Sequence, residues 1–166
     1  MIAELIREMA KVNDGDPERV GHALKVLGYA RCIAGCEQAD EHTQQITQAA
    51  AVLHDIAIRH CEQAFGSCGG KLQEQHGPAI ARPILEKYTD DNALIDRVCF
   101  LIAHHHTYDG IDGLDYRALV EADFLVNAEE GNIPMQAFWA ALANYFDTQT
   151  GKALTKTLFG TPKLDQ

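Results

Sequence analysis

Residues 49–57 read AAAVLHDIA, an apolar run that ends with an imidazole and a carboxylate side by side. A helix start precedes this run at Asp40, and Ile46, Ala50 and Leu53 follow it at the spacing of one helical face. The pattern therefore predicts a core helix whose last turn carries two polar side chains into the interior of the fold.

Helical periodicity extends through most of the remaining chain. The triplet Asp16-Pro17-Glu18 combines a capping residue, a proline at the first helical position and an acid in the first turn. The glycine-containing stretch from Arg59 to Lys71 is expected to be a loop, and the residues from Gly151 a short helix with a loose tail. Further helix starts are expected at Asp90 or Asp91, Asp115 and Pro134.

No alternating run is long enough to predict a strand. We therefore expect one all-α domain of about six or seven helices, occupying residues 1–166.

Composition excludes several classes of function. The net charge of −10 disfavours binding to a nucleic-acid polymer, because the phosphate backbone is repelled. The apolar runs are too short to cross a membrane, and charges within Met1–Lys11 argue against a signal peptide. The five cysteines match neither a disulfide framework nor a zinc knuckle, so they are expected to be reduced thiols in a cytoplasmic protein.

Polar residues occupy positions on or beside apolar helical faces, where a solvated side chain is not expected. A buried carboxylate without a partner costs several kcal/mol, so inward-facing acids and histidines on different helices suggest a shared divalent cation. The set comprises His22, the pair His54-Asp55, the run His104-His105-His106, and Asp123.

The order and context of these residues resemble the HD superfamily of metal-dependent phosphohydrolases. The family's first metal-binding histidine falls on His22 in ERVGHALKVLGYARCIA, its namesake pair on His54-Asp55, and its last aspartate on Asp123 in LVEADFLVN. The resemblance covers residues 18–127 and leaves the C-terminal helices and tail, residues 134–166, outside it. It implies a compact helical domain in which these four residues bind a cation.

Two further elements resemble the two-metal members of the superfamily. His76, in EQHGPAIA, stands where such members carry an additional ligand, and His104 and His105 stand where they carry one or two more. Helical phase favours His105, whereas His106 is expected on the solvent or substrate side. The implied centre binds one or two divalent cations, bridged by Asp55, and imidazole with carboxylate suits Mn, Fe, Co, Ni or Zn.

The resemblance implies hydrolysis of a small phosphate ester, such as a nucleotide or a related metabolite, by a metal-activated water, with Asp55 and His54 as the catalytic residues. Arg59, Lys71 and Arg82 are candidates to bind the substrate phosphate, and Asn127 is a candidate partner of Asp123. No membrane partner is expected, and a homodimer is one option for the oligomeric state.

Two other functions remain open. The first is a di-iron oxygenase of the same superfamily, resembling inositol oxygenase and using an equivalent six-ligand set. The second is a non-catalytic sensor or interaction module that uses the same fold.

Overall fold

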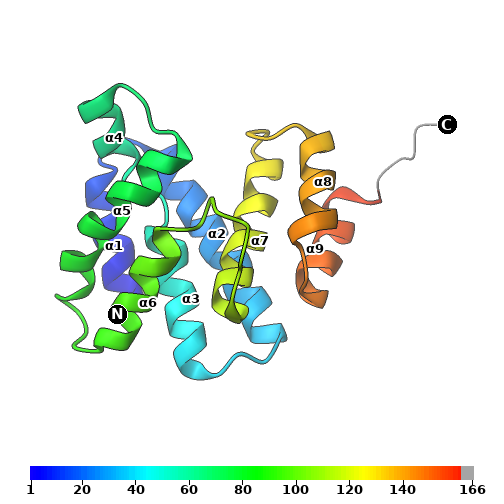
Figure 1. Cartoon of the computed structure of the whole chain (residues 1–166), viewed down its shortest axis with the longest axis horizontal. Helices are drawn as coiled ribbons and strands as arrows, with labels where there is room; N and C mark the ends of the chain where they lie inside the picture. Colours follow the sequence, from blue (N-terminus) through cyan, green and yellow to red (C-terminus); the bar gives the residue numbers. More distant parts are fainter. Residues whose placement is uncertain (162–166) are drawn as a thin grey trace.

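The computed structural model describes residues 1–161 of the chain. Within these residues the chain forms nine α-helices and no strand, which confirms the all-α prediction (Figure 1). The predicted tail falls partly on residues 162–166, which lie outside the described residues. The helices are α1 (Ile2–Val12), α2 (Pro17–Cys36), α3 (Glu41–Leu53), α4 (Ile58–Phe65), α5 (Gly70–Leu85), α6 (Asn92–Ile102), α7 (Gly113–Glu129), α8 (Met135–Tyr145) and α9 (Gln149–Phe159).

Three of the predicted helix starts depend on aspartate caps. Asp16, Asp40 and Asp91 each accept a hydrogen bond from the backbone N–H three residues later, at 3.0, 2.9 and 3.0 Å. Such a cap satisfies one of the N–H groups that the first turn leaves unpaired. Local sequence thus determines where α2, α3 and α6 begin.

The predicted loop from Arg59 to Lys71 is mostly helical. Helix α4 continues to Phe65, with Cys61 buried against the core, and it ends where Gly66 adopts φ 70°. Because the left-handed conformation suits glycine, the glycines end one helix and precede the next without unfolding the whole stretch. The connection between α4 and α5 is only residues 66–69.

Helix α7 also begins earlier than predicted, at Gly113 rather than Asp115. The carboxylate of Asp115 lies in the first turn and accepts hydrogen bonds from Arg97 at 2.7 and 2.8 Å. The aspartate therefore ties α7 to α6 instead of capping a helix.

Helix α3 occupies the centre of the bundle and packs against α1, α2, α6 and α7. Residues 49–53 are each at most 1% exposed, because small and apolar side chains allow neighbouring helices to approach from all sides. Helices α8 and α9 cover α7 and α2 at one end of the molecule (Figure 1).

Helices α5 and α6 approach each other closely at Gly77. A Cβ at this position would lie 2.5 Å from Cγ2 of Ile102. The close packing brings the first turns of α5 next to the turn that follows α6, where the three consecutive histidines lie.

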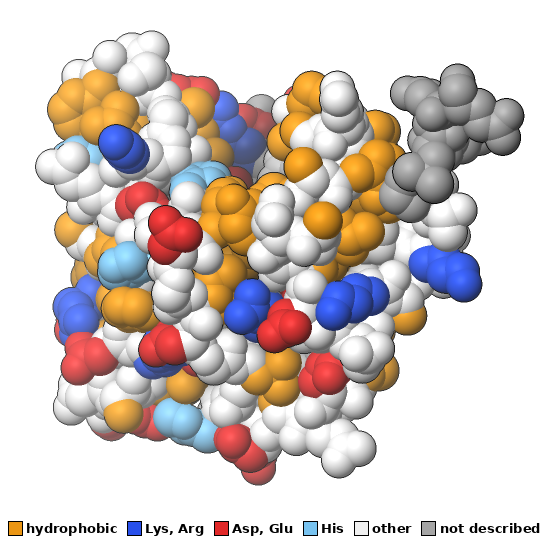
Figure 2. Space-filling view, turned by 45° about the vertical axis from the view of Figure 1, so that its right-hand side comes forward, with side chains coloured by type: hydrophobic (Ala, Val, Ile, Leu, Met, Phe, Trp, Pro, Cys, Tyr) orange, Lys and Arg blue, Asp and Glu red, His pale blue; other side chains and the backbone are white. Residues whose placement is uncertain are grey.

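No helix within residues 1–161 combines the length and the apolar character needed to cross a bilayer. Figure 2 shows acidic and basic side chains interspersed over the face that it presents. The excess of negative charge is therefore not gathered into one continuous acidic area on that face.

Candidate metal centre

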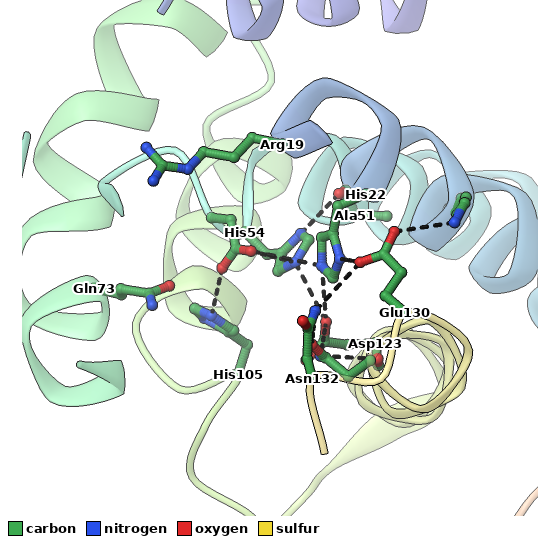
Figure 3. Close-up of polar contacts among 12 residues, drawn as sticks. Arg19, His22, Ala51, His54, Gln73, His105, Asp123, Glu130 and Asn132 are labelled. Atoms are coloured by element: carbon green, nitrogen blue, oxygen red, sulfur yellow. Dashed lines mark hydrogen bonds and ion pairs between the residues drawn. The ribbon is translucent and has the colours of Figure 1, made fainter. Parts of the chain in front are cut away.

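Four side chains from three separate segments meet at one point (Figure 3). His22 comes from the second turn of α2, His54 and Asp55 from the turn after α3, and Asp123 from α7. Nε2 of His22 lies 3.2 Å from Oδ1 of Asp123 and 3.6 Å from Oδ2 of Asp55. Nε2 of His54 lies 3.4 and 3.6 Å from the same two carboxylates, respectively from Asp55 and Asp123. The structure thus brings together the four residues that the resemblance assigned to the first cation.

Backbone contacts orient the imidazole of His54. Its Nδ1 lies 2.9 Å from the carbonyl oxygen of Ala51, and since a carbonyl only accepts, Nδ1 must carry the proton. Nε2 is fully buried and has no hydrogen-bond partner within residues 1–161. The ring therefore turns Nε2 toward the cluster, where a cation could replace the proton on this nitrogen.

A carboxylate orients His22 in the same sense. Its Nδ1 lies 2.9 Å from Oε2 of Glu130, at the end of α7. Lys25 and Asn132 donate in turn to Glu130, at 3.1 and 3.3 Å. Glu130 does not stand out from the sequence, because 108 residues separate it from His22.

Asp123 is also held by its own helix. Nδ2 of Asn127, one turn further along α7, donates to Oδ1 of Asp123 at 2.8 Å. This is the contact expected of Asn127 from its spacing.

A second group of donors adjoins the first through Asp55. Its Oδ1 lies 3.5 Å from Nε2 of His105, and a nitrogen of His106 lies in the same group. Nδ1 of His105 lies 2.8 Å from the carbonyl oxygen of Ile102, so that Nδ1 carries a proton and Nε2 is the nitrogen that faces Asp55. Nε2 of His105 and Nε2 of His106 are buried, and neither has a hydrogen-bond partner among the residues that the structure describes.

Two of the predicted ligands lie elsewhere. His104 turns to the outer face of α6, where its ring stacks on Phe100 and its Nδ1 lies 2.7 Å from the Phe100 carbonyl oxygen. His76 packs against Phe65 and His60, with ring centroids 4.9 and 5.5 Å away. Neither belongs to the two donor groups found among the described residues. Within the histidine run, His106 takes the place that was expected for His104.

The predicted phosphate-binding residues do not line the cleft beside the cluster. Arg59 donates to the backbone carbonyls of Val12 and Asp14, and Arg82 pairs with Asp96 at 2.6 Å. Lys71 is an exposed residue in the first turn of α5. The cleft is lined instead by two other basic residues, Arg19 and Lys25. Arg19 lies three residues before His22 on α2 and Lys25 three residues after it, and in the sequence both resemble solvated helix residues.

The electrostatics of the cluster favour positive charge between the carboxylates. Burial acts to lower the pKa of His54, but Asp55 and Asp123 outweigh it and raise that pKa well above its usual value. Burial likewise acts to raise the pKa of Asp55, yet His54 and His105 hold it well below the usual range. Burial, with the neighbouring His105, lowers the pKa of His106 to about 4, so this imidazole is neutral at pH 7. The site therefore offers anionic oxygens together with a neutral imidazole.

The donor set fits a divalent cation. Imidazole nitrogens and carboxylate oxygens are the ligands that first-row transition metals accept, and three of the nitrogens have no other partner. Helix α3 ends directly before His54 and α6 ends two residues before the histidine run, and the partial negative charge at a helix C-terminus favours a cation nearby.

A cleft of about 830 Å³ opens above the cluster. Asp55, Asp123, His22 and His106 contribute to its lining, together with Arg19 and Lys25 on its walls. The cluster is therefore accessible to a small molecule.

Comparison with known proteins identifies the class. The HD domain family matches residues 19–134, which is more than half of the chain, and the chain belongs to this family. The matched range contains all four residues of the first cluster.

A solved structure agrees with the family assignment. The fold is similar to the crystal structure of a predicted HD superfamily hydrolase from an uncultured Thermotogales bacterium, with a TM-score of 0.65 and 25% sequence identity. The similarity covers 94% of this chain and 82% of that chain. None of the curated proteins matches the chain.

Proposed function

We propose that this HD domain protein is a metal-dependent phosphohydrolase that hydrolyses a small phosphate ester. The observation that carries the proposal is the convergence of buried, unpartnered imidazole nitrogens and two carboxylates beneath an accessible cleft. His22, His54, Asp55 and Asp123 would hold the first cation.

Asp55 is suited to bridge a second cation. Its Oδ2 faces His22 and His54, whereas its Oδ1 faces His105 at 3.5 Å. Asp55 belongs to the donor group that also contains His105 and His106, and its Oδ2 lies 3.6 and 3.4 Å from Nε2 of His22 and of His54 in the other group. This geometry supports a binuclear centre.

Bound cations would supply Lewis acidity toward a phosphoryl oxygen and lower the pKa of an attacking water. The role of the chain is to fix the ligands before the substrate arrives: Glu130 holds the ring of His22, and the Ala51 carbonyl holds that of His54. Arg19 and Lys25 place positive charge on the cleft walls. Both are paired with acids, Arg19 with Glu62 at 2.6 Å and Lys25 with Glu130 at 3.1 Å, so they favour a phosphate without leaving a net cationic surface.

The size of the cleft supports a substrate of nucleotide dimensions. Small-molecule sites commonly occupy about 300–1,000 Å³, and the cleft falls within this range. The substrate class that we propose is a nucleotide or a related phosphorylated metabolite, hydrolysed in the cytoplasm.

The oxygenase alternative has less support. Its six-ligand set included His76, which packs against His60 and Phe65 rather than beside Asp55. The non-catalytic alternative does not explain why the donor groups line an open cleft.

Phosphate release from a panel of nucleoside monophosphates and sugar phosphates, each with added Mn²⁺ or Co²⁺, tests the proposal. We expect turnover with at least one substrate, its abolition by EDTA and its return on adding the cation. Oxygen consumption without phosphate release would contradict hydrolysis.

A further inference from the structure

Gln73 is a buried polar residue that does not stand out in the amino-acid sequence. It lies in the first turns of α5, is 7% exposed, and lines the same cleft as Asp55 and His106. A buried amide normally has both its donor and its acceptor satisfied.

Only one end of the Gln73 amide is satisfied. Its Nε2 donates to the carbonyl oxygen of Cys68 at 2.7 Å, and since a carbonyl cannot donate, the amide orientation is determined. Oε1 is therefore the atom that remains, and it is buried without a hydrogen-bond partner in the described part of the chain. Figure 3 shows the Gln73 carboxamide directed toward His105.

Most of the other buried side-chain atoms without a partner belong to the two donor groups. Five buried side-chain atoms in the described part of the chain have no partner, and four of them are Gln73 Oε1 and Nε2 of His54, His105 and His106. A cation beside Oε1 of Gln73 and the nitrogens of His105 and His106 would supply the partner that these buried atoms lack.

Helix α5 holds Gln73 in register with the histidine turn. A Cβ on Gly70 would lie 2.7 Å from the ring of His106, so only glycine allows this approach. Glu74 accepts hydrogen bonds from the His106 backbone N–H at 3.1 Å and from the Thr107 hydroxyl at 2.9 Å. The face of α5 that contacts the histidine turn is therefore the face that carries Gln73.

We propose that Oε1 of Gln73 is a ligand of the second cation, beside Asp55, His105 and His106. The inference rests on the proposed function. It assigns to Gln73 the α5 ligand position that the sequence suggested for His76, one turn further along the helix. A neutral carboxamide oxygen is a harder ligand than imidazole, so it shifts the site toward Mn²⁺ or Fe²⁺ relative to a site with a third imidazole.

Titration of the metal-free protein with Co²⁺, followed by calorimetry and by the visible Co²⁺ spectrum, tests this assignment without measuring activity. The variants are Gln73→Leu, which keeps the volume but removes the acceptor, and Gln73→Glu, which keeps an oxygen. His76→Ala is the matched control on the same helix.

We expect wild type to bind two Co²⁺ ions, and Gln73→Leu to bind the second at least roughly tenfold more weakly with the first unchanged. Gln73→Glu and His76→Ala are expected to retain both sites, the former with an altered spectrum. If Gln73→Leu does not fold, as judged by circular dichroism, Gln73→Glu still decides, because loss of its second site or an unaltered spectrum overturns the assignment.

If Gln73→Leu binds both ions with wild-type affinity, Gln73 is not a ligand, and the proposed function remains intact. If the wild-type protein binds only one Co²⁺, the role of Gln73 is also overturned, but a hydrolase with one metal ion remains consistent with the result. If the wild-type protein binds no Co²⁺, the proposed metal-dependent function itself is overturned.

Discussion

Nδ1 of His22 lies 2.9 Å from a carboxylate oxygen of Glu130, across the interface between α2 and the end of α7. The contact leaves Nε2 of the same ring facing Asp123 and Asp55. A carboxylate that receives the distal N–H of a metal-binding histidine fixes the ring and makes its other nitrogen a stronger ligand. Glu130 therefore orients a metal ligand, His22, without being a ligand itself.

Glu130→Gln should weaken binding of the first cation by roughly 10-fold, because the neutral amide accepts the His22 proton less strongly. The measurement is the Co²⁺ dissociation constant of the purified variant. Glu129→Gln is the control, since Glu129 pairs with Lys25 and Tyr29 but not with His22. Equal affinities for the two variants would show that Glu130 does not support the ligand.

Asp55→Ala should abolish metal-dependent hydrolysis and remove the coupling between the two donor groups, because Asp55 is the residue whose two oxygens face both. Circular dichroism should still report a helical protein, since Asp55 lies in a turn after α3. Asp109→Ala, at an exposed loop position, is the control. More than about half of the wild-type rate in Asp55→Ala would refute the bridging role.

Gly70→Ala should disturb the second donor group, since the added methyl would lie 2.7 Å from the His106 ring. Binding of the second Co²⁺ is expected to weaken by roughly tenfold while the first is unaffected. Gly69→Ala is the matched control, because a Cβ there meets nothing within 4 Å. Unchanged binding in Gly70→Ala would remove His106 from the centre.

Gly151→Ala tests how α9 is joined to the domain. A Cβ there would lie 1.9 Å from Oε2 of Glu121, whose buried carboxylate is held by the backbone N–H groups of Asp147 and Thr148. The free energy of unfolding in urea should fall by about 1–3 kcal/mol. Gly28→Ala, with open space around the new Cβ, should instead raise it by roughly 0.5–1 kcal/mol. Equal effects would mean that the Glu121 contact does not constrain the helix.

The sequence was most informative where a signal is local. A capping aspartate accepts a hydrogen bond from an N–H three residues away, so the helix starts at Asp16, Asp40 and Asp91 could be predicted from the local sequence. The pair His54-Asp55 was equally easy to identify, because the apolar run before it leads into the core, where His54 is buried and Asp55 is partly buried.

Contacts between distant segments were not accessible in this way. The orientation of His22 depends on Glu130, and the choice among His104, His105 and His106 depends on how the turn after α6 packs against α5. His76 resembled a ligand by its place after the glycine-rich stretch. The glycines of that stretch concealed helix α4, whose last residue, Phe65, packs against His76.

The claim that His22, His54, Asp55 and Asp123 hold a divalent cation is tested most directly by elemental analysis of protein purified without added metal. We expect about one to two equivalents of a transition metal per chain, and a higher melting temperature when the metal is restored after chelation, because only the folded chain assembles these ligands. Less than about a tenth of an equivalent, with no stabilisation by Mn²⁺, Fe²⁺, Co²⁺, Ni²⁺ or Zn²⁺, would contradict the metal centre.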